Sequence, residues 1–421
     1  MEIPAPRTVE DVISDGFFLS AACDAAFYQR YAPIHGVEVN FDNSTAGNFG
    51  GYAPDLVGDV RIFTGDSTAD FRCTRLAVIQ HGRWHWATSR TRIVDVPDFH
   101  SVRLARQELM QALRTLCNGN PVMVAKQHLP VGAVDAVVAI HLEDRVPALP
   151  FQQALVHGLT ETDPQRPIDE KRALLGLAAH YGISLYTGDK KDFEAATSPL
   201  RFSQGLEVDL DYSSPQPRIT RISGGLETAA VLADAHYLAV EHQFLFTAHM
   251  PQASAAIDLR TGRLTVTSPA RSKQALETEA HIIATVDSTR WRWAWADDNL
   301  TGSPAQIQSS QLRKFGVDHA VMDFVRPVLP VDYARELRLP QAAMVVLGLW
   351  NVIAVPLNAE TTALVLFDAP GLALPPLNDT IARSVLAVPL APAVASSPRL
   401  RQRALQSYGK HRGRDFPSLP Q

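Results

Sequence analysis

The sequence has few cysteines and no long apolar run, and each scarcity excludes a class of protein. The three cysteines are widely spaced and form no Cys-x-x-Cys pair, which argues against a disulfide framework or a zinc knuckle. The most apolar stretch, around 342–349, is much shorter than the roughly 20 residues of a membrane-spanning helix. The amino terminus lacks the charged and apolar regions of a signal peptide. We therefore expect a cytoplasmic protein with no membrane segment, no bound metal and no cofactor.

Lysine is also scarce, because only seven of the 39 basic residues are Lys and 32 are Arg. Such a bias, with many Ala and Pro, is typical of a GC-rich genome and favours a bacterial source. The net charge of −5 and the pI near 6.3 disfavour a nucleic-acid binder, which is usually basic. At 421 residues the chain exceeds one ordinary core, so two or more folded units are expected.

Familiar catalytic signatures are missing as well. The sequence has no Gly-x-Ser-x-Gly turn, no P-loop and no Gly-x-Gly-x-x-Gly after a predicted strand. Catalytic groups can still be brought together in space from distant positions. We therefore name no catalytic residue and leave the possibility of catalysis open.

What the sequence does contain is an apparent repeat, marked by the Trp-rich segments 83–86 and 290–295. Aligning Trp84 with Trp291 also places Ala77 on Ala284 and Arg83 on Arg290. A helical pattern follows each segment, over 101–117 in the first and from Ser303-Pro304 in the second. In the second pattern we expect Gly316 to cap the carboxyl end of the helix.

The repeat predicts an α+β protein of two related domains, each a mostly antiparallel sheet packed with helices. The predicted first repeat spans 1–215 and carries an insertion near 132–163, on the assumption that helix 169–181 matches helix 341–350. The second repeat spans 225–390. Residues 396–421 are polar and Arg-rich and predict a basic, flexible tail.

Strand alternation divides the Trp segments into two faces. Tryptophans fall on one face, and we expect Trp295 to continue the row begun by Trp291. Cationic side chains fall on the other. An aromatic platform beside cationic groups could stack a base or a sugar, but a Trp face that forms each domain core, with the arginines pointing to water, is the favoured interpretation. The candidate binding residues are Arg83, His85, Arg290, Arg292 and Trp295.

A second candidate is a row of alternating carboxylates on one predicted strand: Glu207, Asp209 and Asp211. Three carboxylates on one face could bind a hard cation. They also fit a solvent-facing strand whose apolar residues point inward, and we favour this interpretation.

The segment 291–299, which begins Trp-Arg-Trp-Ala-Trp-Ala, resembles the hallmark of a family of uncharacterised bacterial domains. The resemblance extends over about 227–367 and implies an α+β fold, present here as a tandem duplication. It implies no activity.

Three functions remain open from the sequence. The favoured one is a non-enzymatic binding or accessory protein, of a regulatory, immunity or defence type, whose partner is another protein. A small molecule could bind in a groove between the two copies. The alternatives are an enzyme acting on a phosphate or sugar substrate, and a single-stranded nucleic-acid binder.

Overall fold

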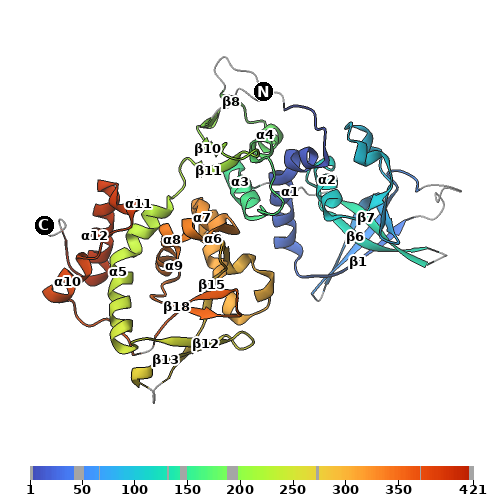
Figure 1. Cartoon of the computed structure of the whole chain (residues 1–421). Helices are drawn as coiled ribbons and strands as arrows, with labels where there is room; N and C mark the ends of the chain where they lie inside the picture. Colours follow the sequence, from blue (N-terminus) through green and yellow to red (C-terminus); the bar gives the residue numbers. More distant parts are fainter. Residues whose placement is uncertain are drawn as a thin grey trace. The chain divides into compact units, whose positions relative to one another are not determined.

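The computed structural model describes residues 3–41, 52–65, 67–129, 132–142, 149–186, 198–271, 275–369 and 371–416. The chain divides into two compact units, which we call unit 1 (Met1–Ser223) and unit 2 (Gly224–Gln421). Both units combine helices with mostly antiparallel sheets, which confirms the α+β class (Figure 1). In the described part of the chain, no helix has the length and apolar character needed to cross a membrane.

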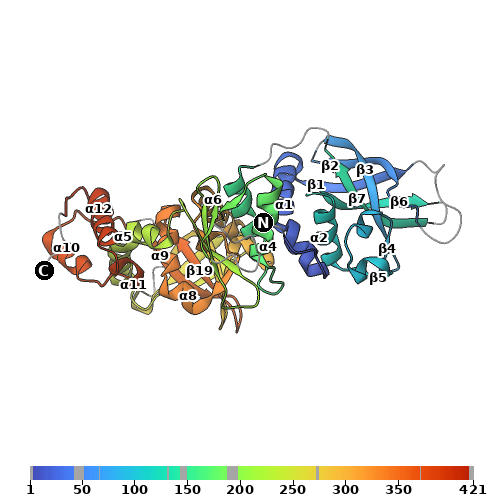
Figure 2. The ribbon, with the colours of Figure 1, turned by 90° about the horizontal axis from the view of Figure 1, so that it is seen from above.

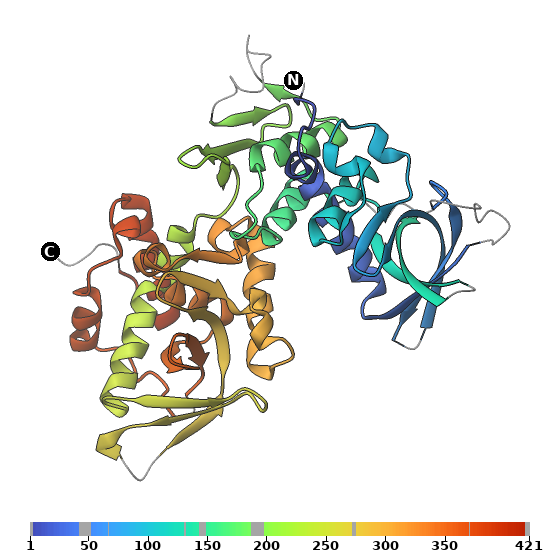
Figure 3. The same cartoon turned by 45° about the vertical axis from the view of Figure 1, so that its right-hand side comes forward.

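Unit 1 begins with a long helix and is built around a ring of strands. Helix α1 (Val9–Tyr31) starts at a capping box in which Thr8 and Asp11 exchange hydrogen bonds. Strands β1 (Ile34–Phe41), β2 (Val57–Thr64), β3 (Ser67–Gln80), β7 (Gly132–His141) and β6 (Val122–Leu129) then pair in that order, and β6 closes the ring by a short parallel pairing with β1. Figure 3 shows these curved strands.

Shorter elements extend this barrel and cover α1. Strand β4 (Arg83–Trp86) pairs with β3, β5 (Arg103–Leu104) pairs with β4, and α2 (Gln107–Leu116) follows (Figure 2). Helices α3 (Phe151–Thr160) and α4 (Glu170–His180) pack on α1. The last strands of unit 1 form a separate sheet: β8 (Leu185–Tyr186), β9 (Leu200–Phe202), β10 (Glu207–Asp211) and β11 (Arg218–Ile222).

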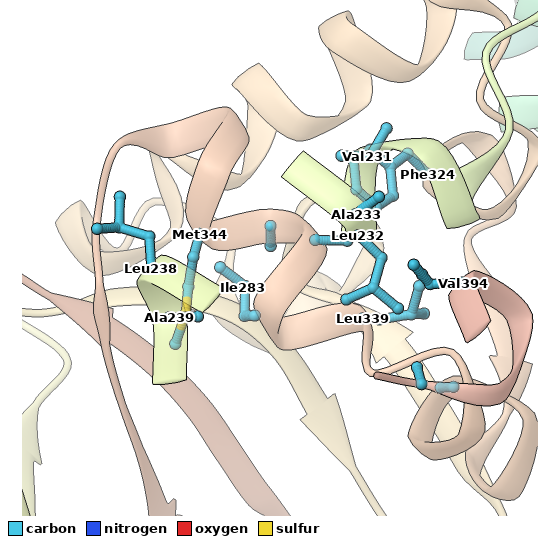
Figure 4. Close-up of a cluster of buried hydrophobic side chains, with 14 of the residues drawn as sticks. Val231, Leu232, Ala233, Leu238, Ala239, Ile283, Phe324, Leu339, Met344 and Val394 are labelled. Carbon is cyan, nitrogen blue, oxygen red and sulfur yellow. The ribbon is translucent and has the colours of Figure 1, made fainter. Parts of the chain in front are cut away.

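Unit 2 is organised around α5 (Thr228–His249), which is apolar on most of its faces and is therefore buried on several sides. Figure 4 shows Val231, Leu232 and Leu238 of this helix among side chains of its core. The main sheet has the order β17-β16-β15-β19-β18. Its strands are β15 (His281–Val286), β16 (Arg290–Trp293), β17 (Val328–Pro330), β18 (Asn351–Pro356) and β19 (Thr362–Phe367).

The other elements of unit 2 surround this sheet. A three-stranded sheet contains β12 (Ser254–Asp258), β13 (Arg263–Thr267) and β14 (Leu276–Glu279). The helices after β16 are α6 (Ser309–His319), α7 (Met322–Val325), α8 (Val331–Glu336) and α9 (Leu339–Leu347). The chain ends with α10 (Asp379–Leu386), α11 (Pro392–Ala395) and α12 (Pro398–Arg412).

The Trp strands of the two units pair in the same register. Ala77 faces Trp86 across β3 and β4, and Ala284 faces Trp293 across β15 and β16. The next pairing, of β3 with β7 and of β15 with β19, is interrupted by a register shift at the same place, just before these two alanines. Each unit therefore contains a strand order β6-β7-β3-β4 or β18-β19-β15-β16.

Several expectations differ from the structure. Residues 132–141 are the strand β7 inside the sheet, so the segment 132–163 does not begin as an insertion. The prediction aligned the two copies by helices with leading prolines, whereas in the strand orders β6 and β7 occupy the places of β18 and β19. Gly316 lies inside α6, where an added Cβ would meet Phe324 at 2.8 Å, and Ala320 caps this helix with a φ of 50°.

The basic segment from 396 also differs from a flexible tail, since residues 398–412 form α12. One face of α12 buries Ala404, Leu405 and Tyr408 against unit 2. The arginines of α12 make the segment polar, and one of them, Arg403, forms an ion pair with Asp234 of α5 at 2.5 Å. An amphipathic helix with a basic outer face therefore accounts for this part of the sequence.

Candidate functional site

The barrel strands of unit 1 border an open cavity of about 870 Å³. Side chains and backbone of all five barrel strands line it, together with the carboxyl end of α1. Three aromatic rings border it, from Tyr31, Phe41 and Phe71. The polar groups at its edge include two exposed ion pairs, Arg61 with Asp70 at 2.7 Å and Arg72 with Asp59 at 2.8 Å.

An arginine side chain points into the interior of this barrel. Arg75 follows Phe71 and Cys73 at alternate positions of β3, so it shares their inward face. It is only 5% exposed. Its Nη1 donates to Gln127 Oε1 at 3.5 Å, and its Nη2 donates to the Ala53 carbonyl oxygen at 3.2 Å.

Aromatic rings stabilise this guanidinium, which lies 5.4 Å from the ring centre of Phe41 and 5.4 Å from that of Tyr52. No carboxylate among the described residues forms an ion pair with Arg75, and its Nε has no hydrogen-bond partner there. Burial lowers the pKa of Arg75. The side chain is thus a buried cation with unused donors.

Tyr52 connects Arg75 to a second cavity, of about 530 Å³. Its hydroxyl donates to Gln80 Oε1 at 3.1 Å, and its ring lies 5.8 Å from that of His85. The cavity is lined by Tyr52, His85, Trp86, Phe99, His100, Ser101 and Val102. His85, predicted from the sequence, therefore borders a cavity, whereas Arg83 is exposed at the start of β4.

The tryptophans belong mainly to the cores. Trp84, Trp291 and Trp293 are at most 2% exposed, and paired rings lie 5.4 Å apart in unit 1 and 5.3 Å apart in unit 2. They form no surface platform. Trp295 does not continue the strand row, because β16 ends at Trp293 and the chain turns into a 3-10 helix over 294–296.

The candidate binding residues of unit 2 have local partners. The ring of Trp295 lies 5.2 Å from the Arg313 guanidinium. Arg290 forms an exposed ion pair with Asp287 at 2.9 Å, and Arg292 donates to the Ala296 carbonyl oxygen at 3.4 Å. These local contacts account for the positions of the three side chains as parts of the turn and strand, without a ligand.

The acidic row of β10 is also internally paired. Glu207 contacts Arg201 at 2.9 Å, Asp209 contacts Arg221 at 2.5 Å, and Asp211 accepts a hydrogen bond from the Ser213 hydroxyl at 2.7 Å. Within the described ranges, no cluster of three or more His, Cys, Asp or Glu side chains could hold a metal ion. The row therefore offers no support for a cation-dependent site.

Sequence reasoning missed Arg75 although a signal was present. Positions 71, 73 and 75 read Phe, Cys and Arg, so a charge ends this alternating apolar row. After the register shift, Ala77 and Ile79 belong to the cluster on the other face of the sheet. The corresponding position of unit 2 is apolar. Counting from the shared register shift, Arg75 corresponds to Ile282, and continuing the β6–β7 and β18–β19 pairings makes Gln127 correspond to Leu357. Both residues of unit 2 belong to its second apolar core.

Comparison with known proteins gives one match. No curated protein and no solved structure matches the chain. The model of a family of unknown function (DUF6882) matches residues 229–370, from α5 to just beyond β19, and α10–α12 lie outside the match. The expected resemblance to an uncharacterised family is therefore confirmed for this stretch of unit 2, which is similar to DUF6882.

Proposed function

We propose that this chain is a non-enzymatic binding protein and that the barrel of unit 1 binds a small molecule. The observation that carries the proposal is the open cavity of about 870 Å³ bordered by all five strands of the ring. Small-molecule sites commonly enclose about 300–1,000 Å³. The cavity has this size, and it combines a largely polar lining with three aromatic rings.

The proposal includes an origin of both units by duplication. The shared strand order, the shared Trp register and the shared position of the register shift support it. After such a duplication one copy can keep an apolar core while the other acquires a ligand site. The protein partner and the regulatory, immunity or defence role stay predictions from the sequence.

A fluorescence titration with N-phenyl-1-naphthylamine, an uncharged aromatic dye, tests the proposed cavity. We expect saturable binding to the full chain and weaker binding to Leu142→Trp, which places a large ring at the cavity wall. Val124→Trp is the matched control, because Val124 is 44% exposed on β6 and does not line the cavity. Absence of saturable binding, or equal weakening by both variants, would contradict the proposal.

A further inference from the structure

A buried guanidinium without a carboxylate partner is costly, and the fold itself does not require one. Removing an ion from water is unfavourable unless hydrogen bonds or an opposite charge replace the lost hydration. Unit 2 forms the same strand pairings with Ile282 and Leu357 at the positions of Arg75 and Gln127. The polar pair is thus specific to unit 1 and calls for an explanation beyond packing.

The contacts of Arg75 leave its donors largely unused. A guanidinium carries five N–H donors in a planar fork, and the described contacts engage two of them, one at 3.2 Å and one at the long distance of 3.5 Å. The two flanking rings hold the plane of the group in place without consuming donors. This geometry leaves the fork available for a pair of oxygens from a carboxylate, phosphate or sulfonate.

The position of Arg75 relative to the cavity makes such a contact possible. Its neighbours Phe41 and Gln127 both line the cavity of about 870 Å³. Three acids line the cavity: Asp59 and Asp70 are paired with Arg72 and Arg61, and Glu38 is exposed on β1 and interacts with Arg61. None of the three forms an ion pair with Arg75 in the described part of the chain. An anion that displaces the weak Gln127 contact would therefore meet an uncompensated positive charge.

We infer that the cavity of unit 1 takes an organic anion, an aromatic ring bearing one acidic group, and that Arg75 holds the acidic group while Tyr31, Phe41 and Phe71 contact the ring. This inference rests on the proposed function and names its ligand class. Arg75 is a binding residue in this role, and Gln127 accepts a hydrogen bond from its Nη1 until the anion takes that place.

Two dyes that share a ring system and differ by one sulfonate group test the inference. The probe is 1-anilinonaphthalene-8-sulfonate, and N-phenyl-1-naphthylamine is the same ring system without the sulfonate. We expect Arg75→Ile, which installs the residue of unit 2, to weaken sulfonate binding at least about tenfold, as for loss of a charge-assisted contact. Binding of the uncharged dye should stay within about twofold.

Arg103→Met is the matched control, because Arg103 is an exposed arginine of unit 1 that pairs with Asp98 at 2.6 Å and does not line the cavity. Equal loss of sulfonate binding in Arg103→Met and Arg75→Ile, or no loss in Arg75→Ile, overturns the inference. If only the uncharged dye binds and Arg75→Ile does not change its affinity, the proposed small-molecule site is supported and the proposed anionic ligand is rejected. If neither dye binds the full chain, the proposed function itself fails.

Thermal unfolding of each variant checks that it is folded. Should Arg75→Ile not fold, Arg75→Lys keeps the charge but replaces the fork by a single ammonium group. We expect this variant to bind the sulfonate several-fold more weakly and the uncharged dye normally. Unchanged sulfonate binding in Arg75→Lys would overturn the role of the fork.

Discussion

The two units share a strand scaffold and differ in what they place inside it. In unit 1 the inward face of the sheet carries Arg75 and Gln127 and borders a cavity of about 870 Å³. In unit 2 the corresponding positions carry Ile282 and Leu357, and Ile282 is fully buried in an apolar core. One scaffold thus tolerates either interior, because its backbone pairing is independent of these side chains.

The difference teaches where function should be sought in this chain. The Trp motif is the most visible feature of the sequence, yet it forms cores in both units. A residue that interrupts the apolar pattern in only one unit is the better indicator of a site. The following predictions test the contrast between the units, in order of decreasing expected effect.

The largest effect should come from giving unit 2 the charge of unit 1. Ile282→Arg places a guanidinium in a fully buried apolar core that contains Leu264, Val365 and Phe367. We expect the free energy of unfolding to fall by about 3–5 kcal/mol, the cost of an uncompensated buried charge. Urea denaturation followed by circular dichroism measures it.

Arg75→Ile is the reciprocal control, since it replaces a costly group by the residue that unit 2 uses. It should leave the free energy of unfolding unchanged or raise it. A loss of stability in Arg75→Ile as large as that in Ile282→Arg would show that the barrel of unit 1 needs the guanidinium for folding.

A second contrast concerns acid. Burial lowers the pKa of His236 to about 4, with Arg338 contributing, and burial beside Arg412 lowers that of His242 to about 4. Above about pH 6.5 both histidines are neutral in the folded and unfolded states. As the pH falls from about 6.5 to about 4, the unfolded state binds protons that the folded state excludes, so stability is lost. At a pH below about 4, the excluded protonation of His236 would have lowered the free energy of unfolding by at most about 3 kcal/mol.

Unit 1 contains a buried carboxyl group whose contribution to stability depends on pH in the opposite direction. Burial raises the pKa of Asp24 to about 6, although Arg114 at 2.9 Å opposes the shift. Its contribution to stability is therefore present at low pH and is lost as the pH rises from about 4 to about 6.

Thermal unfolding between pH 4 and pH 7 should show acid destabilisation in the wild type and a weaker pH dependence in His242→Phe, which preserves the stacking on Trp350. An unchanged pH profile in His242→Phe would argue against this assignment.

The sequence predicted much of the scaffold because the relevant signals are local. The Trp alternation located β4 and β16 with their inward faces, and the helical pattern that begins at Ser303-Pro304 contains α6. Trp295 was misplaced because nothing in strand alternation reveals that the chain turns into a 3-10 helix at Ala294.

Long-range pairing could not be predicted in the same way. Residues 132–141 were assigned to an insertion, because the position of this strand between β6 and β3 depends on contacts more than 50 residues apart in the chain. The site has the same limitation. Arg75 is visible as a charge after the apolar Phe71 and Cys73, but its surroundings are not, because the contacts of its guanidinium in the described ranges come from β1, β6 and Tyr52 together.

A third contrast concerns how each unit covers its first helix. In unit 1, α4 approaches α1 through Gly176, where a Cβ would lie 2.0 Å from the Asp15 carbonyl oxygen. In unit 2, α12 packs on α5 through large side chains such as Leu405 and Tyr408. Gly176→Ala should therefore lower the free energy of unfolding by about 1–3 kcal/mol through overpacking. Gly36→Ala, whose Cβ would meet Phe63 at an ordinary 3.5 Å, is the control and should be near neutral in urea denaturation.

The smallest effect should distinguish the turns that follow β3 and β15. Unit 1 turns through His81 and Gly82, both with positive φ (52° and 71°), whereas unit 2 turns beside Asp287. The Asp287 carboxylate accepts from the backbone N–H groups of Thr289 at 2.9 Å and Arg290 at 2.8 Å, and these bonds lower its pKa to about 2.

Asp287→Ala should cost about 1 kcal/mol, because it removes the side chain that satisfies two turn donors. Arg290→Ala should cost less than about 0.5 kcal/mol, since it removes only an exposed ion pair. Urea denaturation of the two variants at neutral pH separates the contributions. If Arg290→Ala lowered the free energy of unfolding more than Asp287→Ala, the hydrogen bonds to the Asp287 carboxylate would not be the main stabilisation of this turn. Arg290 would then be a candidate for a role beyond the strand.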